Sequence, residues 1–391
     1  MHSWTCNKFL SAALFAAVLL AVCRCGAQVD PEHRSLLEVG YDLPLEGQGP
    51  QSGYAYFYYN KPDLIGTNIA LRLALAPVYL NSELGFKELL SRYTDFGVGI
   101  EGGGYGDNFY EVRQGKFLKG ESFNGHGGGS FLSIYQLLNP GMRIPLHLVA
   151  RGGFHYATFH RQSQTAADFV LPEDQYDFYT RAGLRLAGKE PVLYPDLGME
   201  LSFWYQRNWR LTADSYGFDN DRSINPGVNL YWLYGGINYT FKKSGQQVSF
   251  AVTAGDSTDS DRFSAWRLGG VLPLVSEFPL VMPGYYYEEL TAKSFVHLYA
   301  AYEIPLDPGQ LFKFRLEAAS ANLDYLPGFE QNAHWQTGAG CGLTFAPHKK
   351  NFQIVLRYGY GFNAIRDGKE GAHSVGILFQ YDFGKLKKHK D

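Results

Sequence analysis

The chain has no long hydrophobic run beyond its first segment. An apolar run covers Phe9–Val22, but it is shorter than the roughly 20 apolar residues that a helix needs to span a bilayer. After Val22 no run comes close to that length. Transmembrane helices are therefore excluded from the rest of the chain, and any contact with a membrane must use another kind of structure.

The N-terminal run has the order of a secretory signal peptide. Lys8 supplies positive charge before the apolar run, and the small residues of a Cys-Gly-Ala segment follow it. This order predicts a signal peptide at residues 1–27, which Sec-type export removes. Acylation of Cys23 in a lipoprotein fits less well, because bulky Val22 stands where a small residue is wanted.

Cysteine is scarce, and so is charge. Three of the four cysteines, Cys6, Cys23 and Cys25, leave with the expected signal peptide, so Cys341 remains alone. No intramolecular disulfide can then form, and an exported chain must be stabilised in another way. Charged residues make up 19% of the chain, and the formal net charge is -3. This balance gives no reason to expect nucleic acid as a partner.

Catalytic motifs are absent as well. The sequence contains no Gly-x-Ser-x-Gly and no His-Glu-x-x-His, and its glycine-rich segments lack the Lys-Ser/Thr ending of a phosphate-binding loop. We therefore expect no enzyme activity, no catalytic residues and no cofactor. The acidic segments GFDNDRSINPG and GDSTDSD fit solvated turns or surface Ca²⁺ sites. Solvated turns are the simpler interpretation, and we expect no metal.

The sequence is rich in glycine and in aromatic residues, and its apolar residues alternate with polar ones. Tyr and Phe each occur 28 times, and Gly occurs 45 times. The apolar residues have a period of two. In NFQIVLRYGYGFN, for example, Ile354, Leu356 and Tyr358 lie on one face of a strand, and Gln353 and Arg357 lie on the other. Many segments repeat this pattern, and the turns between them are rich in Gly, Pro, Asn and Asp.

Repeated alternating segments of about ten residues are the signature of an outer-membrane β-barrel. Lipid cannot hydrogen-bond a backbone, so only helices or a closed sheet can cross it. The alternation predicts an all-β transmembrane antiparallel barrel of about 14 strands, within a range of 12 to 16. A soluble β-sandwich is the alternative, but the number of long strands together with the signal peptide favours the membrane.

The domain boundaries follow from this assignment. We expect a signal peptide at 1–27, a short periplasmic segment at 28–51, the barrel at 52–384 and a basic tail at 385–391. The stretch SELGFKELLSR reads as a short helix that interrupts the strands. The last strand carries the terminal signal of outer-membrane barrels, which consists of a polar position, a glycine position and two aromatic positions. These places are occupied by Ser374, Gly376, Phe379 and Tyr381.

One segment also resembles a known family. FSAWRLGGVLPLVSEFPLVMPGYYYEELTAKSFVHLYAAYEIPL has a Leu-Gly-Gly at the end of one strand and then a long loop. The loop contains Gly-aromatic-aromatic and a Glu-Leu pair, and the next strand ends in Tyr-x-x-Pro-Leu. Over residues 260–384 the chain resembles the bacterial surface-antigen barrel of the BamA/TamA superfamily. The resemblance implies a loop folded into the lumen, and the N-terminal region resembles that of a barrel-only member without POTRA domains.

The chain departs from the family's pattern inside the loop. The family's Arg-Gly-aromatic tripeptide is replaced by Pro283, Gly284 and Tyr285, so the arginine that pairs with a barrel acid is missing. The position that corresponds to that acid falls on the second strand after the loop. A cationic residue just before the Leu-Gly-Gly glycines is the candidate substitute for the missing arginine. The candidate lumen partners are Arg267, Arg315 and Glu317.

Three functions are consistent with these features. The resemblance implies protein or lipid insertion or transport at the outer membrane of a Gram-negative-type bacterium. The alternatives are a passive pore for small solutes, which the polar inner face favours, and a structural or surface-exposed barrel that uses its acidic loops. The expected partners are outer-membrane lipids, the barrel assembly machinery during biogenesis and an unknown periplasmic protein.

Overall fold

The computed structural model describes residues 32–50, 52–76, 79–103, 109–188, 197–272, 280–347 and 351–384. The expected signal peptide and the basic tail lie outside the described residues, so both stay predictions. Within the described ranges, no helix is long and apolar enough to cross a membrane.

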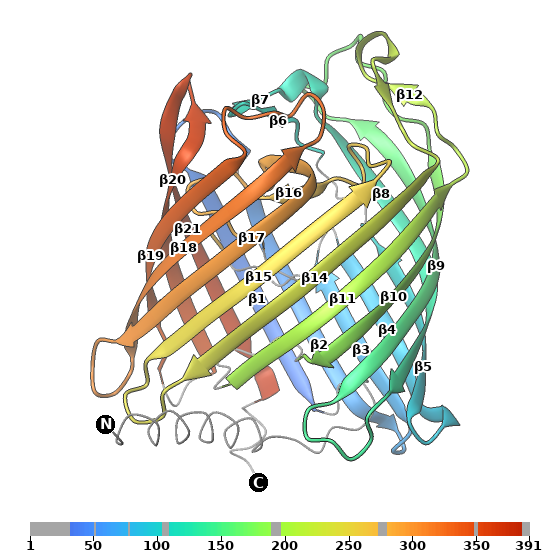
Figure 1. The fold of residues 1–391 in the computed structure, drawn as a ribbon, viewed down its shortest axis with the longest axis vertical. Coiled ribbons are helices and arrows are strands. Elements are labelled where there is room, and N and C mark those ends of the chain that lie inside the picture. Colours follow the sequence, from blue (N-terminus) through green and yellow to red (C-terminus); the bar gives the residue numbers. More distant parts are fainter. Residues whose placement is uncertain are drawn as a thin grey trace, which may run out of the picture.

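The described strands form one closed antiparallel barrel (Figure 1). Each wall strand pairs with its neighbours in sequence, and the first strand, β1, pairs with the last, β21, from Leu36 opposite Asp382 to Pro44 opposite Ser374. Closure leaves no strand edge with bare amides, which is the condition for a sheet to lie in lipid.

Sixteen strands make the wall, and one short extra strand, β16 (Trp266–Leu268), pairs with β17 beside it. The first eight wall strands are β1 (Arg34–Pro44), β2 (Ser52–Ile65), β3 (Ile69–Ala76), β4 (Tyr79–Ser91), β5 (Thr94–Gly102), β8 (Phe123–Leu137), β9 (Leu146–Arg161) and β10 (Gln175–Ala187). The other eight are β11 (Leu197–Arg210), β14 (Gly227–Thr240), β15 (Gln247–Thr258), β17 (Leu290–Pro305), β18 (Phe312–Tyr325), β19 (Trp335–Phe345), β20 (Phe352–Arg366) and β21 (Lys369–Asp382).

The predicted count of about 14 strands is therefore two short, because β1 and β4 were missed. The stretch expected to be a helix, SELGFKELLSR, forms most of β4 instead. Its pairing with β5 shifts register between Phe86 and Ser91, and Glu88 has a positive φ of 54°. This bulge breaks the alternation and leaves Leu89 and Leu90 adjacent and exposed, which imitates a helical pattern.

The barrel also begins earlier than predicted. The wall starts at Arg34 rather than at residue 52, so the 11 residues of strand β1 lie within the segment expected to be periplasmic. Two acidic residues in this strand explain why the sequence pattern did not predict it. Glu38 and Asp42 are almost fully buried on its inner face, where Gln380 donates to Glu38 and the backbone of Val271 donates to Asp42.

The two faces of the wall differ as the alternation predicts. On β11, Phe203 is 50% exposed while its neighbour Ser202 is 3% exposed. On β20, Leu356 and Phe362 point outward and Arg357 is buried on the inner side. The outer face is apolar and uncovered by protein, and the inner face carries the polar groups. This is the pattern of a barrel whose outside meets lipid.

Long connections gather at the upper end of the barrel in Figure 1, which we call the loop end. They span residues 103–122, 162–174, 211–226, 259–289 and 326–334, whereas the turns 66–68, 92–93 and 306–311 at the other end are short. The loop-end connections carry the small elements β6 (Val112–Arg113), β7 (Lys116–Phe117), η1 (Lys119–Glu121), β12 (Ser215–Tyr216), η2 (Phe218–Asn220) and β13 (Arg222–Ser223).

Candidate functional site: an inward-packed segment and a cavity at the loop end

The connection between β16 and β17 packs against the inner face of the wall. We call its residues 280–289 the inner segment. Met282, Tyr285 and Tyr286 are almost completely buried. With residues of β16, β17, β18 and β20 and of the start of β21, Met282 and Tyr285 form the largest apolar cluster of the described chain. Residues 273–279 of the same connection lie outside the described residues.

The predicted loop motif sits at the centre of these contacts. The backbone nitrogen of Gly284 donates to Oγ of Ser374 at 3.1 Å. Gly284 has a φ of +87°, and a Cβ there would lie 1.8 Å from the backbone nitrogen of Gly361. Only glycine avoids both the strained backbone and the collision. On the strand side, a Cβ on Gly338 would lie 2.3 Å from the carbonyl oxygen of Pro283. The segment and the wall therefore meet backbone to backbone.

An ion pair that the sequence did not reveal holds the inner segment to the wall. Arg366, the last residue of β20, donates from Nη1 and Nη2 to the two carboxylate oxygens of Glu289, at 2.8 Å each. Nη2 also reaches the carbonyl oxygen of Gly284 at 3.3 Å. The Arg366 guanidinium lies 3.5 Å from the ring centroid of Tyr286. Bidentate pairing plus ring stacking fixes the orientation of both partners.

The polarity of this pair is the reverse of the one expected from the family resemblance. The acid is in the loop and the arginine is on the barrel strand. Two signals were available: Glu289 belongs to the Glu-Leu pair noted in the loop, and Arg366 ends an alternating strand just before an Asp-Gly turn. Only the fold shows that these residues, 77 positions apart, meet.

The three predicted lumen partners do not form one site. Arg267 donates to Glu288, at the end of its own connection. On β18, Arg315 and Glu317 pair with each other, with Nε and Oε2 3.4 Å apart, and the hydroxyl of Tyr299 donates to Glu317 at 2.5 Å. The expected pairing of Arg267 with the β18 acid is therefore replaced by two separate networks.

The terminal signal divides between the two faces of β21. Ser374 and Gly376 face inward, where Ser374 binds the inner segment and Gly376 leaves room for Leu272: an added Cβ would lie 2.6 Å from its Cδ2. Phe379 and Tyr381 lie on the other face and pair across the barrel seam with residues of β1. The small residues of the signal thus contact the loop, while the aromatic residues face outward.

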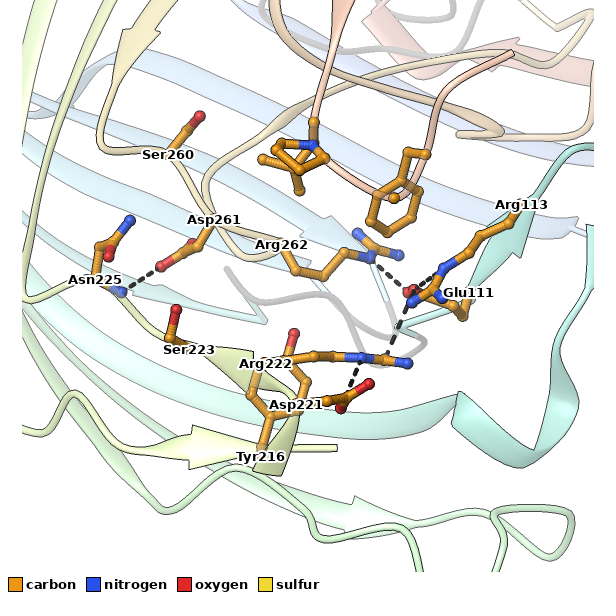
Figure 2. A pocket seen from close by; sticks show the side chains of 14 residues that line it. Glu111, Arg113, Tyr216, Asp221, Arg222, Ser223, Asn225, Ser260, Asp261 and Arg262 are labelled. Carbon is orange, nitrogen blue, oxygen red and sulfur yellow. Dashed lines mark hydrogen bonds and ion pairs between the residues drawn. The ribbon is translucent and has the colours of Figure 1, made fainter. Parts of the chain in front are cut away.

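A second candidate site is a cavity at the loop end. It has a volume of about 370 Å³, and four connections contribute to it. Figure 2 shows the side chains of Arg113, Arg222 and Arg262 converging on Glu111, while Asp261, next to Arg262 in the chain, points toward Asn225. The lining residues are Glu111, Arg113, Tyr216, Asp221, Arg222, Ser223, Asn225, Ser260, Asp261, Arg262, Leu326, Pro327, Gly328 and Phe329.

Glu111 is the electrostatic centre of this cavity. Arg113 donates to Oε1 at 2.6 Å and 3.0 Å, Arg262 donates to Oε2 at 2.9 Å, and Arg222 lies 3.6 Å from Oε1. Burial alone would raise the pKa of Glu111, but the three guanidiniums outweigh it and hold the pKa below its usual range. Glu111 is therefore ionised at neutral pH and ties three loops together.

The acidic segments singled out in the sequence contribute to this cavity. Asp261 accepts from Arg210, from the backbone nitrogen of Asn225 at 2.8 Å and from that of Phe263 at 3.0 Å. Within the described ranges, no group of three or more His, Cys, Asp or Glu side chains is placed to hold a metal ion. Two carboxylates of these segments form ion pairs: Asp261 with Arg210, the last residue of β11, and Asp221 with its chain neighbour Arg222.

No family model and no curated protein matches the sequence. Solved structures do match the fold. CdiB from Acinetobacter baumannii matches with a TM-score of 0.58 at 10% identity, covering 90% of this chain and 60% of that chain. BamA from Haemophilus ducreyi lacking POTRA domains 1–3 matches with 0.54 at 11% identity, covering 89% and 70%. CdiB from Escherichia coli matches with 0.54 at 14% identity, covering 90% and 63%.

At these identities the likeness is one of fold. The chain has the barrel fold of CdiB and BamA, and it spans 60% of the length of the first of these structures. The closed wall and its exposed apolar outer face are those of a barrel that lies in a membrane.

Proposed function

We propose that this chain is an outer-membrane barrel that takes part in inserting or transporting proteins or lipids, with the inner segment as the element that closes its lumen. The observation that carries the proposal is the ion pair between Glu289 and Arg366. It fixes the inner segment on β20, next to β21, the strand that closes the barrel against β1. Asp42 of β1 holds the other arm of the same connection, at Val271. The connection therefore touches both sides of the seam.

The proposal assigns this closure a functional role for an energetic reason. A buried ion pair is costly to desolvate and adds little net stability compared with apolar packing. A barrel of this size also has its backbone satisfied by the wall alone. A segment held by buried charges in addition to apolar contacts is thus better explained by control of the lumen than by stability of the fold. The proposal assigns no catalytic step and no cofactor to the chain.

A passive pore is the second candidate function, and the polar inner face favours it. On that face Glu83 of β4 lies 3.1 Å from Nη2 of Arg72 and 3.8 Å from Nη2 of Arg151. The hydroxyl of Tyr135 donates to the same carboxylate at 2.8 Å. Charge ladders of this kind line water-filled barrels. If the lumen conducts at all times, the inner segment does not close it.

Planar-bilayer recording with the full chain separates the two functions. We expect the wild-type barrel to be silent and Arg366→Gln to conduct, because breaking one partner of a buried pair costs about 3–5 kcal/mol and should release the segment. Arg161→Gln is the matched control: Arg161 also lies at the loop end, but its described contacts are to the carbonyl oxygens of Ala166 and Phe169 in a neighbouring loop. Steady conductance of the wild-type protein would support the passive pore.

Depletion in cells tests the insertion and transport role itself. Loss of the chain should alter the protein or lipid composition of the outer membrane, and wild-type protein but not Arg366→Gln should restore it. An unchanged composition after full depletion would contradict the role.

The expected partners belong to the same proposal. They are outer-membrane lipids around the wall, the assembly machinery during biogenesis, and a periplasmic protein at the end of the barrel opposite the loop end. A crosslinker on the exposed Met142, in the turn 138–145, would capture that last partner.

A further inference from the structure

Hydrogen-bond donors without acceptors face the loop-end cavity. Nη1 of Arg262 is buried and has no hydrogen-bond partner in the part of the chain that the structure describes. The same is true of Nε of Arg222 and of the hydroxyl of Ser260. The Arg262 side chain is only 6% exposed, so water reaches it poorly. Leaving a buried charged donor unsatisfied is energetically unfavourable.

The carboxylates that line the cavity are already engaged. Each oxygen of Glu111 accepts from a guanidinium. Both oxygens of Asp261 accept as well, Oδ2 from Arg210 and from the backbone of Asn225, and Oδ1 from the backbone of Phe263. Within the described ranges, every buried carboxylate oxygen that lines the cavity accepts a hydrogen bond. Three buried donor atoms that line it have no acceptor. Nη1 of Arg262 is therefore a donor without a protein acceptor in the described chain, and a ligand oxygen in the cavity would supply one.

We propose that the loop-end cavity binds a small organic carboxylate of about the size of a sugar acid, whose oxygens accept from Nη1 of Arg262. A guanidinium is the side chain best matched to a carboxylate. The three lining arginines are balanced by Glu111, Asp221 and Asp261, so the lining has no excess positive charge to attract a ligand with several negative charges. The cavity volume of about 370 Å³ lies at the lower end of the range for small-molecule sites.

The walls of the cavity suit such a ligand. Phe329 and Tyr216 supply apolar surface, and the rings of both lie near arginines, with Arg262 5.4 Å from the Phe329 centroid and Arg222 5.8 Å from the Tyr216 centroid. Asp221 is 52% exposed, so the cavity reaches solvent at its edge. Access is from the loop end, where a solute outside the barrel arrives without crossing the lumen. The site is therefore independent of the function proposed for the inner segment.

Calorimetric titration of the folded full chain in detergent micelles tests the proposal. Glucuronate is the probe and glucose is its neutral control, because the two differ only at the carboxylate. We expect saturable binding of glucuronate and none of glucose. Arg262→Lys keeps the charge but removes the unpartnered nitrogen, and it should bind glucuronate about tenfold less tightly. Arg185→Lys is the matched control, since Arg185 pairs with Glu200 at 2.9 Å and does not line the cavity.

A second variant covers the case in which Arg262→Lys does not fold, which the loss of heat-modifiable gel mobility would show. Ser260→Ala removes a hydroxyl that has no hydrogen bond in the described chain, so it should fold normally and bind glucuronate about threefold less tightly. The proposal is overturned if the wild type gives no saturable heat with glucuronate, if glucose binds equally well, or if every folded variant of the two binds like the wild type.

Discussion

At the scale of single residues, buried charges are used as connectors between segments far apart in the sequence. Arg366 joins a wall strand to Glu289, and Arg262 joins its loop to Glu111, 151 positions away. Buried pairs contribute less to net stability than their number suggests, but removing one partner is severe. Their role here is to select one arrangement of loops, since that arrangement pairs the buried carboxylates of Glu289 and Glu111 with arginines.

Glu111 gives the loop end a defined response to acid. The pKa of Glu111 is lowered in the folded chain, so its contribution to stability is present above the unfolded pKa of about 4.3 and is lost as the pH falls through the lower, folded value. Protection factors from hydrogen exchange at 109–113 should therefore stay constant from pH 7 to pH 5 and fall in stronger acid. Glu111→Gln should weaken them between pH 7 and pH 5, by a factor that corresponds to about 3 kcal/mol, and its difference from the wild type should shrink in stronger acid, where Glu111 itself becomes neutral.

The control for this prediction is Glu173→Gln. Glu173 is an exposed acid in the neighbouring loop 162–174, so the variant should keep the wild-type protection and the wild-type response to acid. Equal acid sensitivity in Glu111→Gln and the wild type would show that other groups hold the loops.

At the scale of elements, the inner segment packs closely on strands β19 and β20 because glycines there carry no side chain. Glycines on the inner face of the wall let the backbone at Pro283 and Gly284 approach directly. Glycine in a strand interior weakens the strand itself. The loss is offset where the freed space admits another backbone, which explains why glycine recurs on this part of the wall.

Gly338→Ala should displace the inner segment without opening the barrel. The new Cβ would lie 2.3 Å from the carbonyl oxygen of Pro283, a backbone atom that cannot rotate away, and overpacking of this kind costs about 1–3 kcal/mol. Hydrogen exchange should rise at residues 280–289 and stay unchanged in β19. Gly53→Ala is the matched control, because a Cβ there meets nothing within 4 Å. Equal hydrogen-exchange protection of residues 280–289 in both variants would show that the close approach does not hold the segment in place.

At the scale of the whole molecule, lipid replaces the second layer that a soluble sheet needs. The outer face carries exposed apolar side chains around the wall, including Leu132, Phe203, Phe250, Leu356 and Ile377. No protein layer covers them in the described chain (Figure 1). Such a surface is stable only in hydrocarbon or detergent.

A charge placed on that surface should therefore destabilise the folded barrel in a bilayer. Phe203 lies in the middle of β11 and is half exposed, so Phe203→Arg should lower the free energy of unfolding by about 2–4 kcal/mol if this position lies at the bilayer midplane. Urea titration in lipid vesicles measures the loss, and Phe203→Leu, which keeps an apolar side chain, should show little. A chain that stays folded and dispersed in buffer without detergent would contradict the lipid-facing assignment.

The sequence by itself predicted the class of fold and most of the wall. Fourteen of the wall strands follow from alternation, because a period of two is a local property that lipid on one side and polar groups on the other impose on each strand separately. It missed β4, where a bulge breaks the period, and β1, where Glu38 and Asp42 are inward acids that only a closed barrel satisfies.

The partners inside the barrel were decided by the tertiary structure alone. Pro283, Gly284 and Tyr285 were singled out from the sequence, but Arg366 and Ser374, which bind this region of the loop, were not predicted as its partners. Pairing across 77 residues depends on which strands become neighbours when the sheet closes, and no local pattern encodes that. Alternation fixes the face on which a side chain lies, whereas closure and register fix what it meets there.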